Sequence, residues 1–270
     1  MRTSLKAALA ASVLMVGFGA TPAFAQDEAD PPSEFTFSGY VQGVSDYRFR
    51  GLSLSGGDPA IQGTINLNHS SGFYAGAWAS SLDANITPFY GDVELDLYAG
   101  WTGPITSGLT ADVGVLRYIY PSNDGNGPAD YWEPYASLST TVGPVGAKLG
   151  VAYVPEGQDS QGNEDNIYVF TDLSAGIPNT PISLSGHLGY QNGSFQAPRI
   201  LTGDSLTDDS GFDYSVGVTY NITDKLSVSA TYVGVEGNSS ESEYRAGTNG
   251  RNPVLVVGND TVVATIKLAL

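Results

Sequence analysis

The feature that most constrains this sequence is a two-residue alternation of apolar and polar side chains that recurs along most of its length. In the stretch PAIQGTINLN, Ile61, Ile65 and Leu67 alternate with polar residues at positions 62, 64, 66 and 68. Successive side chains of a β-strand point to opposite faces, so this period predicts strands and not helices. The chain is therefore expected to be all-β, with strands that have one apolar and one polar face.

The same pattern predicts about twelve strands. Most of them approach the ~9 to 11 residues that a tilted strand needs to cross a bilayer. The expected strands cover residues 35–51, 58–69, 72–81, 91–101, 108–120, 131–142, 145–154, 166–175, 182–191, 211–221, 225–235 and 259–270.

The connections between these strands alternate in length. Short turns are expected at 69–72, 102–108, 143–144, 176–181 and 222–224, whereas most of the intervening connections are long and polar. Regular alternation of this kind, with both ends of the strand region on the short side, is typical of outer-membrane barrels. The sequence therefore predicts a transmembrane antiparallel up-and-down β-barrel over residues 35–270, with the short turns in the periplasm. Ten or fourteen strands remain alternatives, because PVLVVG within 236–258 has the pattern of a further hairpin above the membrane.

The first 25 residues have the features of a secretory signal peptide. Arg2 and Lys6 precede an apolar run, and Ala23-Phe24-Ala25 has the pattern of a cleavage site. The run is shorter than the ~20 residues of a membrane-spanning helix. Residues 26–34 are acidic and contain proline, so they are expected to be flexible. Export followed by barrel formation places the protein in the outer membrane of a Gram-negative bacterium.

The charge balance is strongly acidic. The chain has 11 Lys and Arg against 28 Asp and Glu, and removal of residues 1–25 takes away two basic residues and no acid, which leaves 9 − 28 = −19. This charge argues against nucleic acid as a partner, because phosphates need basic side chains. The absence of cysteine excludes disulfides and a thiol nucleophile. The expected partners are outer-membrane lipid, lipopolysaccharide, small solutes and the barrel-assembly machinery, for which the apolar alternation of the last strand is a typical signal.

Aromatic residues are expected to form two belts at the lipid–water interfaces. Tyrosine and tryptophan favour this boundary in membrane proteins. Arg117, on the apolar face of its strand, is expected at the upper interface with its side chain reaching toward the head groups. The predicted girdle comprises Tyr47, Phe49, Trp101, Trp132, Tyr153, Tyr190, Tyr220 and Tyr232.

The motif SDYRFRG, residues 45–51, concentrates rare positive charges beside tyrosine and phenylalanine. If the first strand continues to residue 51, the period of two sends the charges into the lumen and the rings to lipid. Carboxylates from other strands are expected at the same height, near the outer mouth. The predicted constriction is lined by Asp46, Arg48, Arg50, Glu94, Asp96, Glu133 and Asp213.

Two interpretations of this charged ring remain open. The charges either create a field that selects solutes, as charged rings do in pores, or pair with one another and neutralise a polar interior. Twelve strands lie between the filled interior of eight and the open channel of sixteen. Because inner acids outnumber inner bases, a pore is expected to favour cations or neutral solutes.

Enzyme chemistry is not expected. The two histidines, His69 and His187, are not accompanied by a hydrolase or metalloprotease motif, and no phosphate-binding loop occurs. Ser185 lies on the same strand face as His187, but serine is common here, so this proximity is weak evidence for a nucleophile. The acidic loops lack the ligand spacing of an EF-hand. No catalytic residue, metal site or cofactor is therefore predicted.

The stretch from Val44 to Asp83 resembles a proteobacterial family of TorF-like porins, earlier described as proteins of unknown function. The matching elements are Ser-Asp-Tyr-Arg-Phe-Arg-Gly at 45–51, Asp-Pro-Ala at 58–60, Gln-Gly at 62–63 and Tyr-x-Gly-x-Trp at 74–78. The resemblance implies an outer-membrane barrel. The expected function is a narrow, passive diffusion channel for small hydrophilic solutes, and the alternative is a plugged barrel that acts as a structural or surface-interaction protein without conductance.

Overall fold

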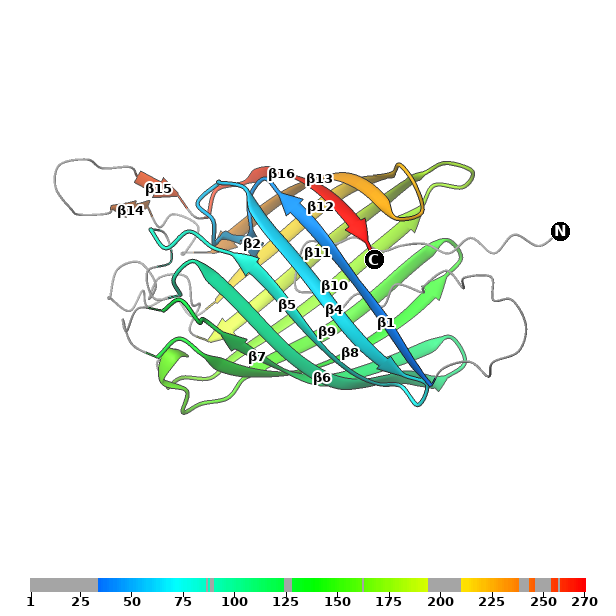
Figure 1. The fold of residues 1–270 in the computed structure, drawn as a ribbon, viewed down its shortest axis with the longest axis horizontal. Helices are drawn as coiled ribbons and strands as arrows, with labels where there is room; N and C mark the ends of the chain where they lie inside the picture. The colour runs from blue at the N-terminus through cyan, green and yellow to red at the C-terminus, as the bar shows by residue number, and fades with distance from the viewer. Residues whose placement is uncertain are drawn as a thin grey trace.

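The structure is a closed β-barrel with its axis running from side to side in Figure 1. It is a computed structural model that describes residues 34–85, 87, 90–123, 128–161, 163–193, 210–237, 243–245, 254–256 and 258–270. The expected signal peptide (1–25) and all but the last residue of the acidic segment (26–34) lie outside the described residues. The barrel strands are β1 (Phe35–Val44), β4 (Ala60–His69), β5 (Phe73–Ser81), β6 (Val93–Thr106), β7 (Leu109–Ile119), β8 (Tyr131–Val142), β9 (Val145–Val154), β10 (Asn166–Gly176), β11 (Ile182–Gly193), β12 (Ser210–Asn221), β13 (Leu226–Gly237) and β16 (Thr261–Ala269).

These twelve strands confirm the predicted fold class and strand number. Each strand pairs antiparallel with its neighbours in the chain, and the sheet closes where β16 pairs with β1. In that closing pair Tyr40 lies opposite Ala269 and Val44 opposite Thr265. No helix among the described residues is long and apolar enough to cross a membrane.

The short turns gather at one end of the barrel, as predicted. They lie on the right in Figure 1, whereas the small hairpin of β14 (Glu243–Arg245) and β15 (Val254–Val256) projects beyond the opposite end. This hairpin confirms the strand pattern of PVLVVG outside the twelve-strand ring. One short turn depends on Gly72, which has a φ of 95° and packs so closely on Thr102 that a Cβ atom would lie 2.2 Å from the Thr102 carbonyl oxygen.

The outward face of the strands forms an apolar surface. Phe37, Ile61 and Val142 are each 71% exposed, and Val216, at the middle of β12, is 66% exposed. Such exposure is costly in water, where large apolar patches are rare on monomeric proteins. An apolar exterior of this kind is compatible with the hydrocarbon core of a bilayer. Within that core every backbone N–H and C=O group needs a hydrogen-bond partner in the protein, and a closed ring of strands supplies one for each.

The first predicted strand is wrong at its upper end. Strand β1 ends at Val44 instead of residue 51, and the following residues leave the wall and turn into the lumen. They form a second small hairpin from β2 (Arg48–Phe49) and β3 (Leu52–Ser53), which is separate from the barrel sheet. We call residues 45–57 the inner hairpin. The only described helical turn, η1 (Asp159–Gln161), lies in the long connection between β9 and β10.

The apolar exterior makes a specific prediction about stability. Replacing Val216 by arginine places a charge at the middle of the lipid face, and we expect the free energy of unfolding to fall by about 2–4 kcal/mol. The measurement is urea-dependent unfolding of the barrel from lipid vesicles. Asp224→Arg, in an exposed short turn, introduces the same side chain and should change stability little; an equal loss for both variants would contradict the assignment of a lipid face.

Candidate functional site

The candidate site is the inner hairpin together with the barrel wall that it touches. Its tip is the two-residue turn Arg50-Gly51, flanked by the pairs Phe49↔Leu52 and Arg48↔Ser53. Arg50 has a φ of 47° and Gly51 a φ of 82°, the positive values that a two-residue type I′ turn requires. A Cβ atom on Gly51 would lie 2.9 Å from Val235 Cβ and 3.2 Å from Asp213 Cβ. The tip therefore extends from the β1–β4 side of the barrel to the wall at β12 and β13.

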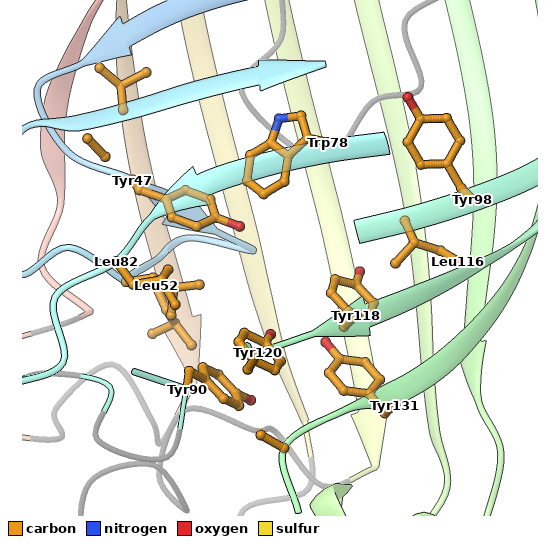
Figure 2. Close-up of a cluster of buried hydrophobic side chains, with 14 of the residues drawn as sticks. Tyr47, Leu52, Trp78, Leu82, Tyr90, Tyr98, Leu116, Tyr118, Tyr120 and Tyr131 are labelled. Atoms are coloured by element: carbon orange, nitrogen blue, oxygen red, sulfur yellow. The ribbon is translucent and has the colours of Figure 1, made fainter. Parts of the chain in front are cut away.

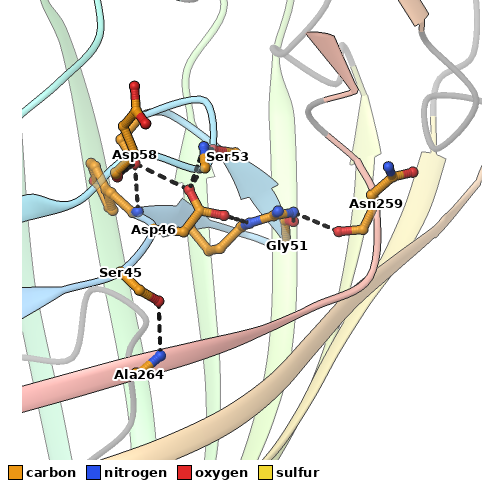
Figure 3. Close-up of polar contacts among 11 residues, drawn as sticks. Ser45, Asp46, Gly51, Ser53, Asp58, Asn259 and Ala264 are labelled. Atoms are coloured by element: carbon orange, nitrogen blue, oxygen red, sulfur yellow. Dashed lines mark hydrogen bonds and ion pairs between the residues drawn. The ribbon is translucent and has the colours of Figure 1, made fainter.

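Asp46 fixes the base of the inner hairpin. Its carboxylate accepts hydrogen bonds from Ser53 Oγ at 2.6 Å, Gly57 N at 3.2 Å and Arg48 Nε at 2.5 Å (Figure 3). Arg48 also donates to the carbonyl oxygens of Gly51 and Asn259, at 3.0 and 2.8 Å. Asp46 and Arg48 are both buried, so these contacts act in a site with little water, where charge-assisted hydrogen bonds are strong.

Arg50 joins the tip of the inner hairpin to three strands. Its guanidinium forms an ion pair with Glu133 of β8, donates to Gln191 of β11 at 3.3 Å and lies 4.1 Å from the centre of the Tyr168 ring of β10. Burial by itself lowers the pKa of Arg50, but the Glu133 carboxylate and nearby tyrosines raise this pKa above its ordinary value. The side chain therefore remains a buried cation, and the ion pair spans the lumen.

An aromatic cluster surrounds the acidic residues of β6. Tyr47 donates to Glu94 at 2.9 Å and packs against Trp78 with 5.5 Å between ring centres (Figure 2). Burial, followed by the charge of Glu94, raises the pKa of Tyr47, so its hydroxyl remains protonated and able to donate. Asp96 is fully buried, and neither carboxylate oxygen has a hydrogen-bond partner among the described residues. The cluster thus contains one satisfied and one unsatisfied carboxylate.

A second buried network lies on β10, β11 and β12. The ring nitrogens of His187 lie 2.6 Å from Asp172 Oδ1 and 2.9 Å from Asp213 Oδ1. The Tyr168 hydroxyl donates a hydrogen bond to Asp213 at 2.9 Å, and its ring packs against the guanidinium group of Arg50. Because both nitrogens of His187 face carboxylates, the arrangement does not pair this histidine with Ser185 as base and nucleophile. No set of three or more His, Cys, Asp or Glu side chains in the described part of the chain is arranged to hold a metal ion.

All seven residues predicted for the constriction are buried inside the barrel. Five lie in the contacts described above, around Arg50 or Asp46, and Glu94 and Asp96 lie in the aromatic cluster. The structure brings Arg50 to Glu133 and Arg48 to Asp46, so it forms the ion pairs of the pairing interpretation. The residues are Asp46, Arg48, Arg50, Glu94, Asp96, Glu133 and Asp213.

Two of the predicted girdle residues are not on the exterior. Tyr47 is 5% exposed and bonds to Glu94 inside the barrel, and Phe49 packs edge-on against Tyr118 at 6.0 Å. Both belong to the inner hairpin, and not to a strand, which is why the expected lipid-facing direction is wrong. The remaining predicted girdle residues point outward and are exposed or half-buried: Trp101, Trp132, Tyr153, Tyr190, Tyr220 and Tyr232.

The upper rim contains an exterior ion pair. Arg117 lies 3.1 Å from Asp130 and 5.0 Å from the Trp132 ring centre. Both charged side chains are partly exposed, so this pair is a surface counterpart to the buried Arg50–Glu133 pair.

Several tyrosines of the lumen were not predicted. Tyr118 donates to Glu133 at 2.9 Å, and Tyr74 donates to Asp112 at 2.6 Å. The inward direction of Tyr168 can be predicted from the sequence, because Tyr168 lies four residues before Asp172 and therefore on the same face of the strand. For Tyr74 no such signal existed, since both faces of its segment are apolar.

A closed barrel with an apolar exterior and a charged interior defines the class as a transmembrane β-barrel with the fold of porins. The chain belongs to the family described as "Bacterial protein of unknown function (Gcw_chp)", whose model matches residues 28–269. This family match does not carry the narrower TorF-like name, which stays a prediction.

The fold of this chain is similar to that of a solved porin at low sequence identity. The NanC porin superposes with a TM-score of 0.51 at 11% identity, over 86% of this chain and 98% of that chain. An outer-membrane channel from Pseudomonas putida F1 gives a TM-score of 0.47 at 12% identity, over 90% and 99%. The outer-membrane channel DcaP of Acinetobacter baumannii gives 0.44 at 11%, over 87% and 97%. No curated protein matches the sequence. The NanC likeness concerns the fold alone.

The buried Arg50–Glu133 pair predicts a large coupling energy. Glu133→Leu leaves Arg50 as an unpaired buried cation and should lower the free energy of unfolding by about 3–5 kcal/mol. The double variant Arg50→Met, Glu133→Leu removes both charges and should recover most of that loss. The comparison is a double-mutant cycle of urea unfolding in vesicles. As a control, Arg117→Met breaks the exposed pair at the rim and should lower the free energy of unfolding by about 0.2–1 kcal/mol. If the losses from the single substitutions at residues 50 and 133 simply add in the double variant, the Arg50–Glu133 pair is contradicted.

Proposed function

We propose that the protein is an outer-membrane channel for small hydrophilic solutes, and that the inner hairpin narrows its outer mouth. The observation that carries the proposal is the charged lumen inside an apolar exterior. A barrel that served only as a scaffold has no need for buried ionic groups, because well-packed apolar residues are as stabilising or more so. A lumen lined with charges resembles the interiors through which hydrated solutes pass.

The lumen charges support a preference for cations or neutral solutes. The described inward-facing carboxylates number seven and the described inward-facing bases four, so three formal negative charges remain with His187 neutral and two with His187 protonated. The acids are Asp46, Glu94, Asp96, Asp112, Glu133, Asp172 and Asp213, and the bases are Arg48, Arg50, Lys148 and Lys267.

We propose the corresponding cellular route from the features of the sequence and of the barrel surface. Residues 1–25 would direct export and be removed, and the barrel-assembly machinery would insert the chain through its final strand. The exposed apolar face and the outward aromatic residues would then contact outer-membrane lipid, with lipopolysaccharide at the rim that contains Arg117 and Trp132. These assignments follow from the chemistry of the surface.

The second candidate function is a plugged barrel that acts in structure or surface interaction. The observation that favours it is the burial of the inner hairpin, whose tip contacts β8, β10 and β11 through Arg50. The two candidates differ in one property, because only the channel conducts ions.

The register of the wall offers a sharp test of the hairpin's role. Val44 and Ala60 are directly paired, so residues 45–59 can be replaced by Asn-Gly, which forms a tight two-residue β-turn. We expect single-channel conductance in planar bilayers to rise at least about twofold over the wild type, because the wider lumen of a twelve-stranded barrel is uncovered. Arg117→Ala, on the exterior rim, should leave conductance unchanged. A silent wild type beside a conducting Asn-Gly variant would favour a barrel plugged by the inner hairpin.

Ion selectivity gives a further prediction. Across a KCl gradient the reversal potential should have the sign of cation preference, and Asp112→Asn should move it toward zero because a lumen carboxylate is lost. Glu156→Gln removes an acid from an exposed loop and should shift the potential less. Clear anion preference of the wild type would refute the proposed charge selection.

A further inference from the structure

A small cavity lies in the lumen beneath the tip of the inner hairpin. Its volume is about 70 Å³, which is room for a few water molecules or one small solute, since a water needs ~10–15 Å³ on this measure. Phe49 and Arg50 of the hairpin line it, together with Asp112, Lys148 and Asp172 of the wall. We infer that this cavity binds a small zwitterion, an α-amino acid with an apolar side chain. The inference rests on the proposed channel and specifies its substrate class.

Lys148 supplies an unpaired cation to the cavity. It lies on β9 directly opposite Asp172 of β10, yet no carboxylate of the described residues lies within 4.0 Å of its ammonium group. Its ammonium group instead faces the Phe170 ring, whose centre is 5.8 Å from Nζ. A lysine among acids that forms no ion pair leaves its ammonium available to a carboxylate from outside the chain.

Asp172 lines the same cavity and has one carboxylate oxygen without a hydrogen-bond partner among the described residues. It is 2% exposed, and its Oδ1 lies 2.6 Å from His187 Nδ1. Its Oδ2 is buried and has no hydrogen-bond partner among the described residues. An unsatisfied buried carboxylate oxygen is costly, so the site favours a ligand that brings a donor. An ammonium group is the donor that also matches its charge.

The combination selects a molecule that has both charges. A simple anion would approach Lys148 but meet Asp112 and Asp172, whereas a simple cation would approach the carboxylates but meet Lys148 and Arg50. A zwitterion satisfies Lys148 with its carboxylate and Asp172 with its ammonium. The aromatic rings of Phe49, Tyr118, Tyr135, Tyr168 and Phe170 also line the cavity, and they favour an apolar side chain over none.

A matched series of ligands tests this inference on the wild-type protein. The full chain, refolded in detergent, is titrated with L-valine, isobutylamine and isovalerate while saturation-transfer NMR reports binding. Isobutylamine lacks the carboxylate of valine, and isovalerate lacks its ammonium. Loss of one charge-assisted contact should weaken binding about tenfold or more. Equal binding of either analogue would overturn the zwitterion assignment, and so would the absence of valine binding.

A matched pair of lysine variants locates the site. Lys148→Met should lose at least about tenfold in valine affinity, because it removes the cation from the cavity. Lys267→Met is the control, since Lys267 is the other lumen lysine, 4.0 Å from the Tyr40 ring centre and not part of the cavity lining. Equal loss for both variants, or retention by Lys148→Met, would overturn the proposed site.

The result of the valine-binding experiments does not depend on whether the barrel conducts ions. Binding is measured without ion flow, and heat-modifiable migration on denaturing gels confirms that each variant has formed the barrel. KCl conductance without valine binding would overturn the zwitterion site alone. Valine binding by a barrel that carries no current would overturn the channel and leave the binding cavity intact.

Discussion

The structure depends on one constraint, the closure of the backbone hydrogen-bond ring. In hydrocarbon each amide and carbonyl must find a partner within the protein, and the pairing of β16 with β1 removes the last open edge. Once the ring is closed, each side chain faces either lipid or lumen. The alternation of the sequence therefore becomes a division between an apolar exterior and an interior that contains most of the charged residues of the barrel strands.

The same closure creates the problem that the inner hairpin addresses. Twelve strands enclose more space than wall side chains of ordinary size fill. In this protein tyrosines from several strands and residues 45–57 occupy much of that space. Tyrosine suits the position because its ring packs while its hydroxyl bonds to a carboxylate, as Tyr47 does with Glu94 and Tyr118 does with Glu133.

The sequence permits prediction of the wall far better than of its contents. The two-residue alternation of apolar and polar side chains, together with strand length and turn spacing, indicates which residues face inward. Glu94, Glu133 and Asp213 are buried in the lumen, as this alternation predicts. The error at Tyr47 and Phe49 arises because the arms of the inner hairpin alternate in the same way as the strand that precedes them. The turn at Arg50-Gly51 depends on positive φ angles, which glycine signals only weakly. Contacts such as Arg50 with Glu133, 83 residues apart, follow from closure and have no local signature.

The contacts along the inner hairpin show how it is held inside the barrel. Leu52 and Leu54 belong to the same buried apolar cluster as Leu82, and the Leu54 carbonyl accepts a hydrogen bond from Asp83 N at 3.1 Å. The tip, by contrast, is held by the ionic and ring contacts of Arg50. Exposing apolar side chains to water is unfavourable in proportion to their area, and separating a buried ion pair leaves uncompensated charges. Apolar contacts along the arms of the inner hairpin and ionic contacts at its tip therefore act together to hold it against the wall, above the cavity that contains Lys148 and Asp172.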